Sequence, residues 1–148
     1  MSEPTEAQVQ ELYALFSTMA RRFKLAEAQA MPGKPLNQID IQTLLFIADN
    51  PGAGPTDVAR HLAVAATTMT SATDRLSRQG LLHRERPPEN RRSIALSLTG
   101  RGEEVVEALV EAQVIGCREM LARLDPHEQE QILAYCRKIA STEPPAAG

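Results

Sequence analysis

Apolar residues recur at steps of three and four over much of the chain, with polar residues between them, which is the pattern of helices with one buried face. The first such stretch covers residues 5–31 and is followed by two prolines and a glycine in Met31–Pro35. A second runs from about Asn37 to Asp49, before another break at Asn50–Pro55. Because proline and glycine interrupt helices, the sequence predicts a long amphipathic helix and then a shorter, largely buried one.

Two short helices separated by a tight turn are predicted next. Residues 56–62 follow a proline, whose fixed φ suits a first helical turn, and Asp57 favours that turn through the helix dipole. After residues 63–65 a further helix runs to about Gln79 and ends at Gly80, the residue type that most readily takes the left-handed conformation. Two helices joined in this way form a helix-turn-helix. The packed side of the second helix is expected to contain Met69, Ala72, Thr73 and Leu76.

The periodicity changes from helical to alternating after this helix. Residues 93–98 alternate apolar with small or polar side chains, as a half-exposed strand does, and residues 81–86 form a second strand of the same kind. The segment Pro87–Arg91 lies between them. The sequence therefore predicts a β-hairpin with a projecting tip.

Two more helices complete the predicted fold. Thr99 is placed as the N-cap of a long helix that extends to about Arg123, and Asp125 with Pro126 begins a last helix through about Ser141. The expected fold class is mainly α (α+β). It is a winged helix-turn-helix with a two-stranded β-hairpin wing, flanked by N- and C-terminal helices.

Length and composition fit one domain with an oligomerisation element, since the chain has 148 residues and is 43% hydrophobic. Its uncharged apolar stretches are well short of the roughly 18 residues that a membrane span needs, and its acidic start is unlike a signal peptide. A cytoplasmic protein is expected. Cys117 and Cys136 are expected to be buried small side chains without a disulfide.

The formal net charge of −3 conceals a strong segregation of charge. Residues 60–102 contain eight arginines and three acidic residues, a local balance of +5, whereas the rest of the chain balances at −8. Neutralising nucleic-acid phosphates requires a local basic patch rather than a basic protein. The charge pattern therefore favours DNA binding.

The start of the second helix of the helix-turn-helix carries small polar residues that suit the major groove of DNA. Hydroxyl groups there can reach base edges and phosphates, and threonine methyls can touch thymine methyls. The alternative is a helix start with solvated hydroxyls and no partner. The candidate residues are Ala66, Thr67, Thr68, Thr70, Ser71 and Arg75.

The predicted hairpin carries most of the remaining positive charge of the central region. Guanidinium groups on a projecting loop can enter a narrow minor groove or clamp its phosphates. The alternative is a solvated charged turn. The candidate residues are Arg84, Arg86, Asn90, Arg91 and Arg92.

Three segments, in this order, resemble the signature of the MarR family of transcription regulators: DRLSRQGLL at 74–82, ENRRS at 89–93 and LTGRG at 98–102. The resemblance extends over essentially the whole chain. It implies a homodimer with intertwined terminal helices that binds double-stranded, pseudo-palindromic DNA with half-sites about 10 base pairs apart. It also implies a repressor that a small aromatic or phenolic ligand releases from DNA.

This resemblance gives the chain four parts. They are an N-terminal dimerisation helix and linker (1–35), a winged helix-turn-helix DNA-binding domain (36–100), C-terminal dimerisation helices (101–141) and a disordered tail (142–148).

Two positions depart from the family pattern. Asn90 stands where the family has an aspartate before the paired arginines, and Ala65 replaces the usual serine or threonine cap of the recognition helix. Because an asparagine cannot form an ion pair, Asp74 or Glu89 is hypothesised to brace the paired arginines instead. The resemblance makes Arg91 the wing residue expected in the minor groove, with Arg92 bracing it or touching phosphate, and the reverse assignment of the two arginines stays open.

The sequence carries few signals for functions other than DNA binding. No nucleophile with a base and no phosphate-binding loop is evident, so an enzyme is not expected, and neither is a cofactor. His61, His83 and His127 lack the spacing of a metal site. The alternatives left open are a winged-helix module that binds another protein, an oxidation sensor acting through cysteine, and an activator in place of a repressor.

The position of an effector site is not predicted. Four large side chains are candidates to line a pocket, but they are expected to be ordinary core. They are Met19, Phe23, Phe46 and Met120.

Overall fold

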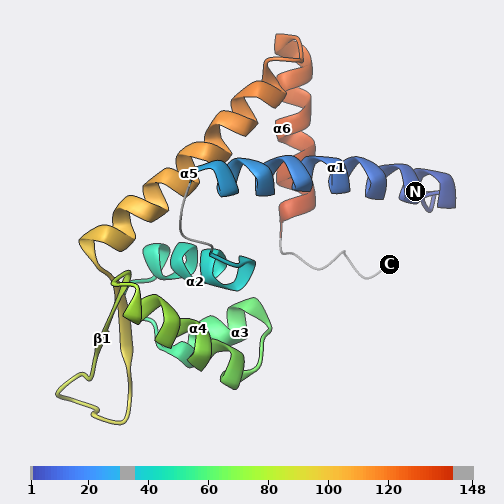
Figure 1. The fold of residues 1–148 in the computed structure, drawn as a ribbon. Helices are drawn as coiled ribbons and strands as arrows, with labels where there is room; N and C mark the ends of the chain where they lie inside the picture. The colour runs from blue at the N-terminus through green and yellow to red at the C-terminus, as the bar shows by residue number, and fades with distance from the viewer. Residues whose placement is uncertain (1, 31–35, 142–148) are drawn as a thin grey trace.

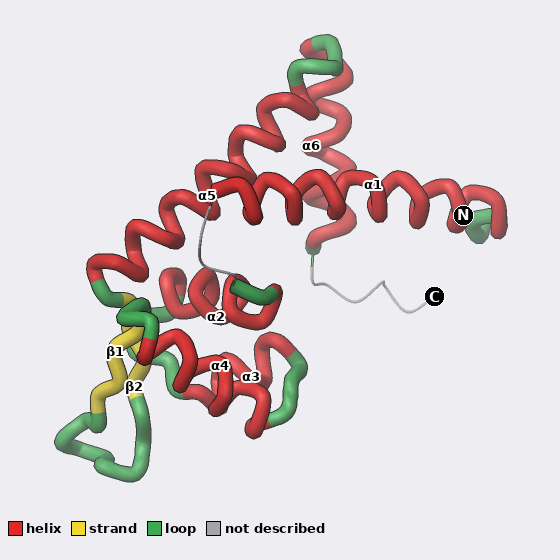
Figure 2. Tube along the Cα trace, viewed as in Figure 1, coloured by secondary structure: helices red, strands yellow, loops and turns green. Residues whose placement is uncertain are grey.

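A computed structural model of the chain describes residues 2–30 and 36–141. In that part of the chain, six helices and one two-stranded antiparallel sheet are formed (Figures 1 and 2). The helices α2, α3 and α4 and the strands β1 and β2 make up a winged-helix body, and α1, α5 and α6 are helical arms that extend from it (Figure 1). The elements are α1 (Glu6–Ala30), α2 (Gln38–Asp49), α3 (Pro55–Leu62), α4 (Ala66–Arg78), β1 (Leu82–Glu85), β2 (Ala95–Leu98), α5 (Gly100–Leu121) and α6 (Pro126–Ala140).

The order and the type of all predicted elements are confirmed, and their ends move by no more than two residues. The long helix after the hairpin stops at Leu121 rather than near Arg123. The last residue of the predicted first helix, Met31, and the predicted tail over 142–148 lie outside the described residues.

The core of the winged-helix body is a continuous apolar cluster between its helices and the hairpin. Leu44 and Ile47 of α2 are fully buried against the neighbouring elements. Met69 and Leu76 fill the inner side of α4, as the sequence predicts. Burying an aliphatic side chain of this size contributes about 1.5–3 kcal/mol, so the cluster fixes α4 firmly to the body.

The helices α2 and α4 begin in different ways. Asn37 caps α2, because its Oδ1 accepts the backbone N–H of Asp40 at 2.8 Å while Asp40 Oδ2 accepts the N–H of Asn37 at 3.3 Å. Ala65, which precedes α4, gives the helix no side-chain hydrogen bond. At the other end of α4, Gly80 has a φ of +75°, as predicted for a residue that closes a helix.

The hairpin pairs Leu82 with Leu98 at its base and Glu85 with Ala95 at the far end of the strands. Both strands are shorter than the predicted 81–86 and 93–98. The residues between the strands form local turns instead of cross-strand bonds, for example from the N–H of Ser93 to the carbonyl of Asn90 at 3.1 Å.

The base of the hairpin is bonded to the rest of the body. The N–H of Gly52 donates to the carbonyl of Leu96 at 2.8 Å, and the N–H of Leu96 donates to the carbonyl of Ala53 at 2.9 Å. Leu96 is also fully buried. The wing therefore projects from a fixed base.

The start of α5 is locked against the end of α4. Thr99 Oγ1 donates to the carbonyl of Gly80 at 2.6 Å and accepts the N–H of Gly102 at 2.9 Å, which confirms Thr99 as the N-cap. A Cβ at position 102 would collide with the carbonyl oxygen of Leu81, so only glycine permits this approach. As a result, the body and the first turn of α5 are held together closely.

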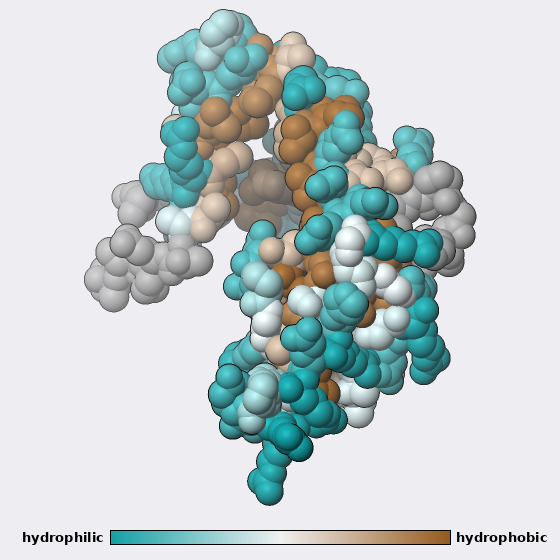
Figure 3. Space-filling model, turned by 90° about the vertical axis from the view of Figure 1, so that its left-hand side faces the viewer, coloured by the Kyte–Doolittle hydropathy of each residue, from teal (hydrophilic) through white to brown (hydrophobic). Residues whose placement is uncertain are grey.

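The helical arms leave large apolar surfaces uncovered. α1 crosses α5 where Gly116 faces Phe23, at a point where an added Cβ would lie 3.2 Å from the phenyl ring. α6 has no buried residue. Figure 3 shows apolar side chains along the upper part of the molecule, above a mostly hydrophilic body. The exposed large apolar residues are Val9, Leu12, Tyr13, Leu15, Phe16, Leu25, Val110, Val114, Ile115, Ile132, Leu133, Tyr135 and Ile139.

The expected burial of the two cysteines is wrong for the single chain. Cys117 on α5 and Cys136 on α6 are both free and exposed. The apolar periodicity around them does mark faces suited to burial, but no other element of the same chain covers those faces. Separately, none of the helices in residues 2–30 and 36–141 combines the length and the hydropathy needed to cross a bilayer.

Candidate nucleic-acid interface

The helix α4 has one buried and one exposed side. Thr73 belongs to the buried side, where its hydroxyl donates to the carbonyl of Met69 at 3.0 Å. The hydroxyl of Thr70 donates to the carbonyl of Ala66 at 3.0 Å, so Thr70 can only accept a further hydrogen bond. The five small residues selected from the sequence at the start of α4 are all exposed: Ala66, Thr67, Thr68, Thr70 and Ser71.

Arg75, the sixth candidate on α4, is engaged within the body. Its Nη2 and Nε donate to the two carboxylate oxygens of Asp40 at 2.6 and 3.2 Å. Asp40 is 1% exposed, whereas the side chain of Arg75 is 41% exposed. Hydrogen bonding to Asp40 raises the pKa of Arg75, so this guanidinium stays charged at any ordinary pH. The geometry gives Arg75 a structural partner that the sequence did not predict.

The hypothesis that Asp74 braces the paired arginines of the wing is wrong. Asp74 forms its ion pair with Arg84, which also donates to the hydroxyl of Thr73 at 3.2 Å. The physical reason is position, since Arg84 lies on β1 next to α4, whereas the paired arginines lie beyond the strands. Arg84 thus ties the wing to α4.

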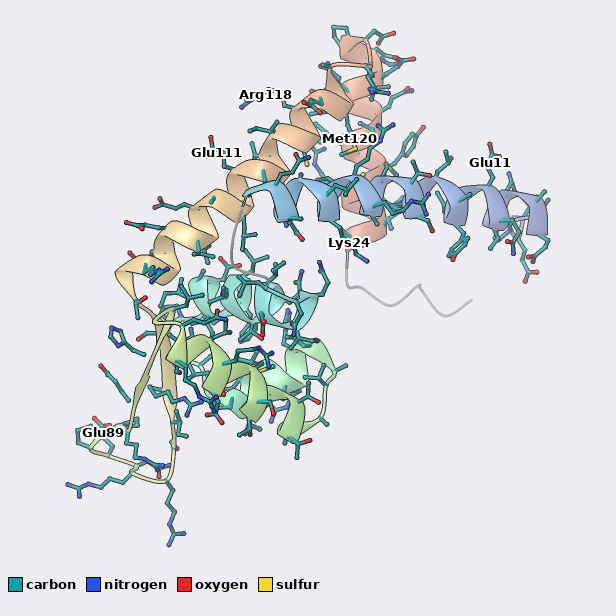
Figure 4. The ribbon with its side chains drawn as sticks, in the orientation of Figure 1. Glu11, Lys24, Glu89, Glu111, Arg118 and Met120 are labelled. Atoms are coloured by element: carbon teal, nitrogen blue, oxygen red, sulfur yellow. The ribbon has the colours of Figure 1, made fainter. Side chains whose placement is uncertain are left out.

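The tip of the wing is shaped by local bonds. Arg86 Nη1 donates to the carbonyl of Arg91 at 2.8 Å, and Asn90 Oδ1 accepts the N–H of Arg92 at 3.2 Å. Glu89 lies at the tip (Figure 4) and forms no ion pair with any described residue. Asn90 therefore braces the tip through a backbone bond rather than through a charge.

The arginines of the tip are available to a partner. Arg91 and Arg92 are exposed, and no described acidic residue pairs with either of them. The wing and α4 both lie at the end of the molecule opposite α6 (Figure 1). The structure thus brings the exposed start of α4 and the free arginines of the wing to one end of the body, while Arg75 and Arg84 are held by carboxylates.

A groove of about 420 Å³ lies between α1 and α5. Met19, Phe23 and Met120 line it, so the expectation that they are ordinary core is wrong for these three. They lie where two arms cross rather than in the apolar cluster of the body. Phe46 does pack against that cluster, and its ring lies 4.5 Å from the ring of His61. Arg22 and Arg123 supply positive charge to the groove, and Glu119 supplies one negative charge.

The sequence and the fold are similar to those of known proteins. A model described as "MarR family" matches residues 34–93. A crystal structure of MarR has a TM-score of 0.71 and 26% identity, over 87% of this chain and 94% of MarR. Residues 34–93 form a MarR-family domain. The transcriptional regulator PrsX of Escherichia coli is 31% identical over 67% of this chain and 60% of PrsX.

Among solved MarR-type folds is Streptococcus pneumoniae FabT in complex with DNA, with a TM-score of 0.77 and 19% identity, over 88% of this chain and 92% of FabT. The fold class predicted from the sequence is confirmed by these similarities. A MarR-family chain is a transcriptional regulator and not an enzyme, which removes the catalytic alternative.

Sequence reasoning missed two acidic residues that organise this MarR-type structure. Asp40 is the buried partner of Arg75. Glu27, in the last part of α1, is 6% exposed and is the one buried residue of that helix. A weak signal existed for Asp40, a charge placed directly between the apolar residues Ile39 and Ile41 of α2. None existed for Glu27, because an acidic residue near the end of a polar helix resembles a solvated one.

Proposed function

We propose that the protein is a homodimeric repressor that acts in the cytoplasm on a double-stranded, pseudo-palindromic DNA site. The observation that carries this proposal is the shared position of the hydroxyl-rich start of α4 and the exposed arginines of the wing (Figure 1). Residues 60–102, which contain both, have a local charge balance of +5. FabT, which has the same fold, was solved in complex with DNA, and this supports DNA as the partner here.

In this proposal the first half of α4 enters the major groove. The hydroxyls of Thr67, Thr68 and Ser71 contact base edges or phosphates, and the threonine methyls pack against thymine. Because Ala65 does not cap α4, the backbone N–H groups of its first turn are free to bind a phosphate. The missing cap therefore favours contact with DNA at some cost in helix stability.

The wing is proposed to contact the neighbouring minor groove. Arg91 and Arg92 insert into that groove or clamp its phosphates, where a narrow groove attracts guanidinium groups. Arg86 and Asn90 contribute by shaping the tip through their bonds to it. Arg84, held by Asp74, sets the position of the wing relative to α4.

The helical arms are proposed to form the dimer. Thirteen large apolar side chains are exposed on α1, α5 and α6, which is more than a soluble chain leaves without a partner. A second copy is the occupant that supplies a symmetric pair of α4 helices about 34 Å apart, one turn of DNA. Residues 1–35 and 101–141 are accordingly proposed as the dimerisation segments, and residues 36–100 as the DNA-binding domain.

The groove between α1 and α5 is proposed as the site of a releasing ligand. Its apolar residues suit an aromatic ring, and Arg22 and Arg123 suit an acidic or phenolate oxygen. A volume of about 420 Å³ is sufficient for a small aromatic acid. Binding of such a ligand is expected to lower the affinity for DNA.

The proposal is tested by titrating the protein against its own upstream intergenic DNA and a scrambled duplex, at several salt concentrations and with competitor DNA. Arg91→Ala is expected to weaken specific binding by about tenfold or more, and to reduce the salt slope if Arg91 contacts phosphate. Arg118→Ala is the matched control, because Arg118 is an exposed arginine of α5 far from the wing (Figure 4).

Specific, salt-sensitive binding that the Arg91 substitution weakens and the Arg118 substitution leaves unchanged supports the proposed function. Equally weak binding of both duplexes by all three proteins contradicts it. That result favours a winged-helix module that binds another protein.

A further inference from the structure

A buried carboxylate lies where the arms meet the winged-helix body. Glu27 of α1 is only 6% exposed, and no other residue of that helix is buried. Gln113 of α5 donates from Nε2 to Glu27 Oε1 at 2.6 Å, and Gln38 of α2 donates from Nε2 to Glu27 Oε2 at 3.3 Å. Each oxygen of the carboxylate is therefore held by a different helix.

The first turn of α2 continues this set of bonds toward α4. Asp40 lies two residues after Gln38, and its two oxygens bind the guanidinium of Arg75. Polar side chains thus join α5 and α1 to α2, and α2 to α4. All four helices are linked by bonds of 2.6 to 3.3 Å.

The chemistry of Glu27 argues for a role in positioning rather than in stability alone. A carboxylate removed from water is costly unless hydrogen bonds satisfy it, and no described cation pairs with Glu27. An apolar side chain would fill the same space at lower cost. Hydrogen bonds differ from apolar contacts in fixing direction and register, which is the advantage that a buried polar group offers.

We propose that Glu27 is a positioning residue that fixes the winged-helix body relative to the arms. In the dimer it thereby sets the separation of the two α4 helices, so this inference rests on the proposed function. The groove between α1 and α5 is lined by Ala26 and Ala112, which are the sequence neighbours of Glu27 and Gln113. A molecule bound in the groove therefore acts on the same bonds that hold the body in place.

The first test measures the separation of the α4 helices without DNA. A spin label is attached at Ser71→Cys, an exposed position of α4, in a chain that also carries Cys117→Ser and Cys136→Ser. Double electron–electron resonance then reports the distance between the two labels of the dimer. One narrow distance is expected for this reference chain.

The variants Gln38→Ala and Glu27→Gln are expected to shift or broaden that distance. Gln38 is exposed, so its substitution removes one hydrogen bond without leaving a cavity, and Glu27→Gln replaces an acceptor with a donor that faces another amide. Gln42→Ala is the matched control, since Gln42 is exposed one turn further along α2. An unchanged narrow distance in both variants overturns the inference, whereas the absence of any dipolar signal contradicts the proposed dimer.

The second test uses duplexes whose half-sites are separated by one or two extra base pairs. The native chain is expected to lose affinity steeply as the spacing changes. The variants Gln38→Ala and Glu27→Gln are expected to reduce this discrimination by roughly 3- to 30-fold, while Gln42→Ala keeps it. Full discrimination in all variants overturns the role of Glu27. If the native chain has no spacing preference, the proposed function itself is contradicted.

Discussion

The winged-helix body and the helical arms use their apolar residues in opposite ways. In the body, the large apolar side chains of α2, α4 and the hairpin close into one cluster. In the arms, Leu109 is the one buried apolar side chain, and all thirteen exposed large apolar residues of the described chain belong to these three helices. Within one chain, the apolar core of the body is therefore closed, whereas the apolar faces of the arms remain exposed.

The two regions also differ in how they use polar groups. The body directs its buried polar contacts inward, as between Asp40 and Arg75, and leaves its exposed arginines at the wing. The arms contain a single buried carboxylate, Glu27, at the place where they join the body. The body therefore forms one closed unit, whereas the arms expose apolar surfaces suited to association and hold their buried carboxylate at the junction with the body.

The largest effect is expected from a charge placed in the exposed apolar surface of the arms. Ile139 of α6 is 73% exposed in the single chain, and the proposed symmetric dimer is expected to bury it in each copy. Ile139→Asp places two charges in that interface and is expected to raise the dimer dissociation constant by at least about a hundredfold. Sedimentation velocity over a range of protein concentrations measures this constant, with the neighbouring Lys138→Ala as control. A dimer of unchanged strength would mean that the interface lies elsewhere.

A smaller effect, on stability, is expected when the ion pair inside the body is broken. The loss is expected to depend on which of the two partners is replaced. Arg75→Met leaves the carboxylate of Asp40, which is 1% exposed, without its partner. The expected loss is about 2–3 kcal/mol, below the range for a fully buried pair because water reaches the guanidinium side. Asp40→Asn leaves the half-exposed Arg75 solvated and is expected to cost about 1 kcal/mol.

Urea denaturation at one fixed protein concentration compares these two variants, because dimerisation makes the midpoint depend on concentration. Equal losses for both would show that the burial of Asp40 does not govern the energetics of the pair. The secondary structure of each variant, measured by circular dichroism, should match that of the native chain.

The sequence predicted most of the body because local signals and packing agree there. Breaks at proline and glycine located the helices, Gly80 and Thr99 marked helix ends, and Met69 and Leu76 identified the inner side of α4. The same logic selects the tip arginines and the exposed residues at the start of α4, since a recognition surface needs polar residues at defined places on a helix and a hairpin. Those residues of α4 are Ala66, Thr67, Thr68, Thr70 and Ser71.

The contacts that the sequence did not predict join distant segments of the chain. Arg75 and Asp40 are 35 residues apart, and Glu27 and Gln113 are 86 residues apart, so no local pattern reveals either contact. The burial of Cys117 and Cys136 was inferred from helical periodicity. Periodicity reports that a face is apolar, but it does not say whether the same chain covers that face.

The smallest expected effect tests whether the uncapped start of α4 serves contact with DNA. Ala65→Ser supplies a hydroxyl that can accept a first-turn N–H of α4 and is expected to stabilise the body by about 1 kcal/mol, raising the melting temperature by roughly 3 °C. The same hydroxyl competes with a phosphate for that N–H, so affinity for the DNA site is expected not to rise. Ala66→Ser, one residue inside the helix, is the control for thermal stability, because a hydroxyl there does not occupy the cap position. If Ala65→Ser raised both stability and affinity, the missing cap would have no part in binding DNA.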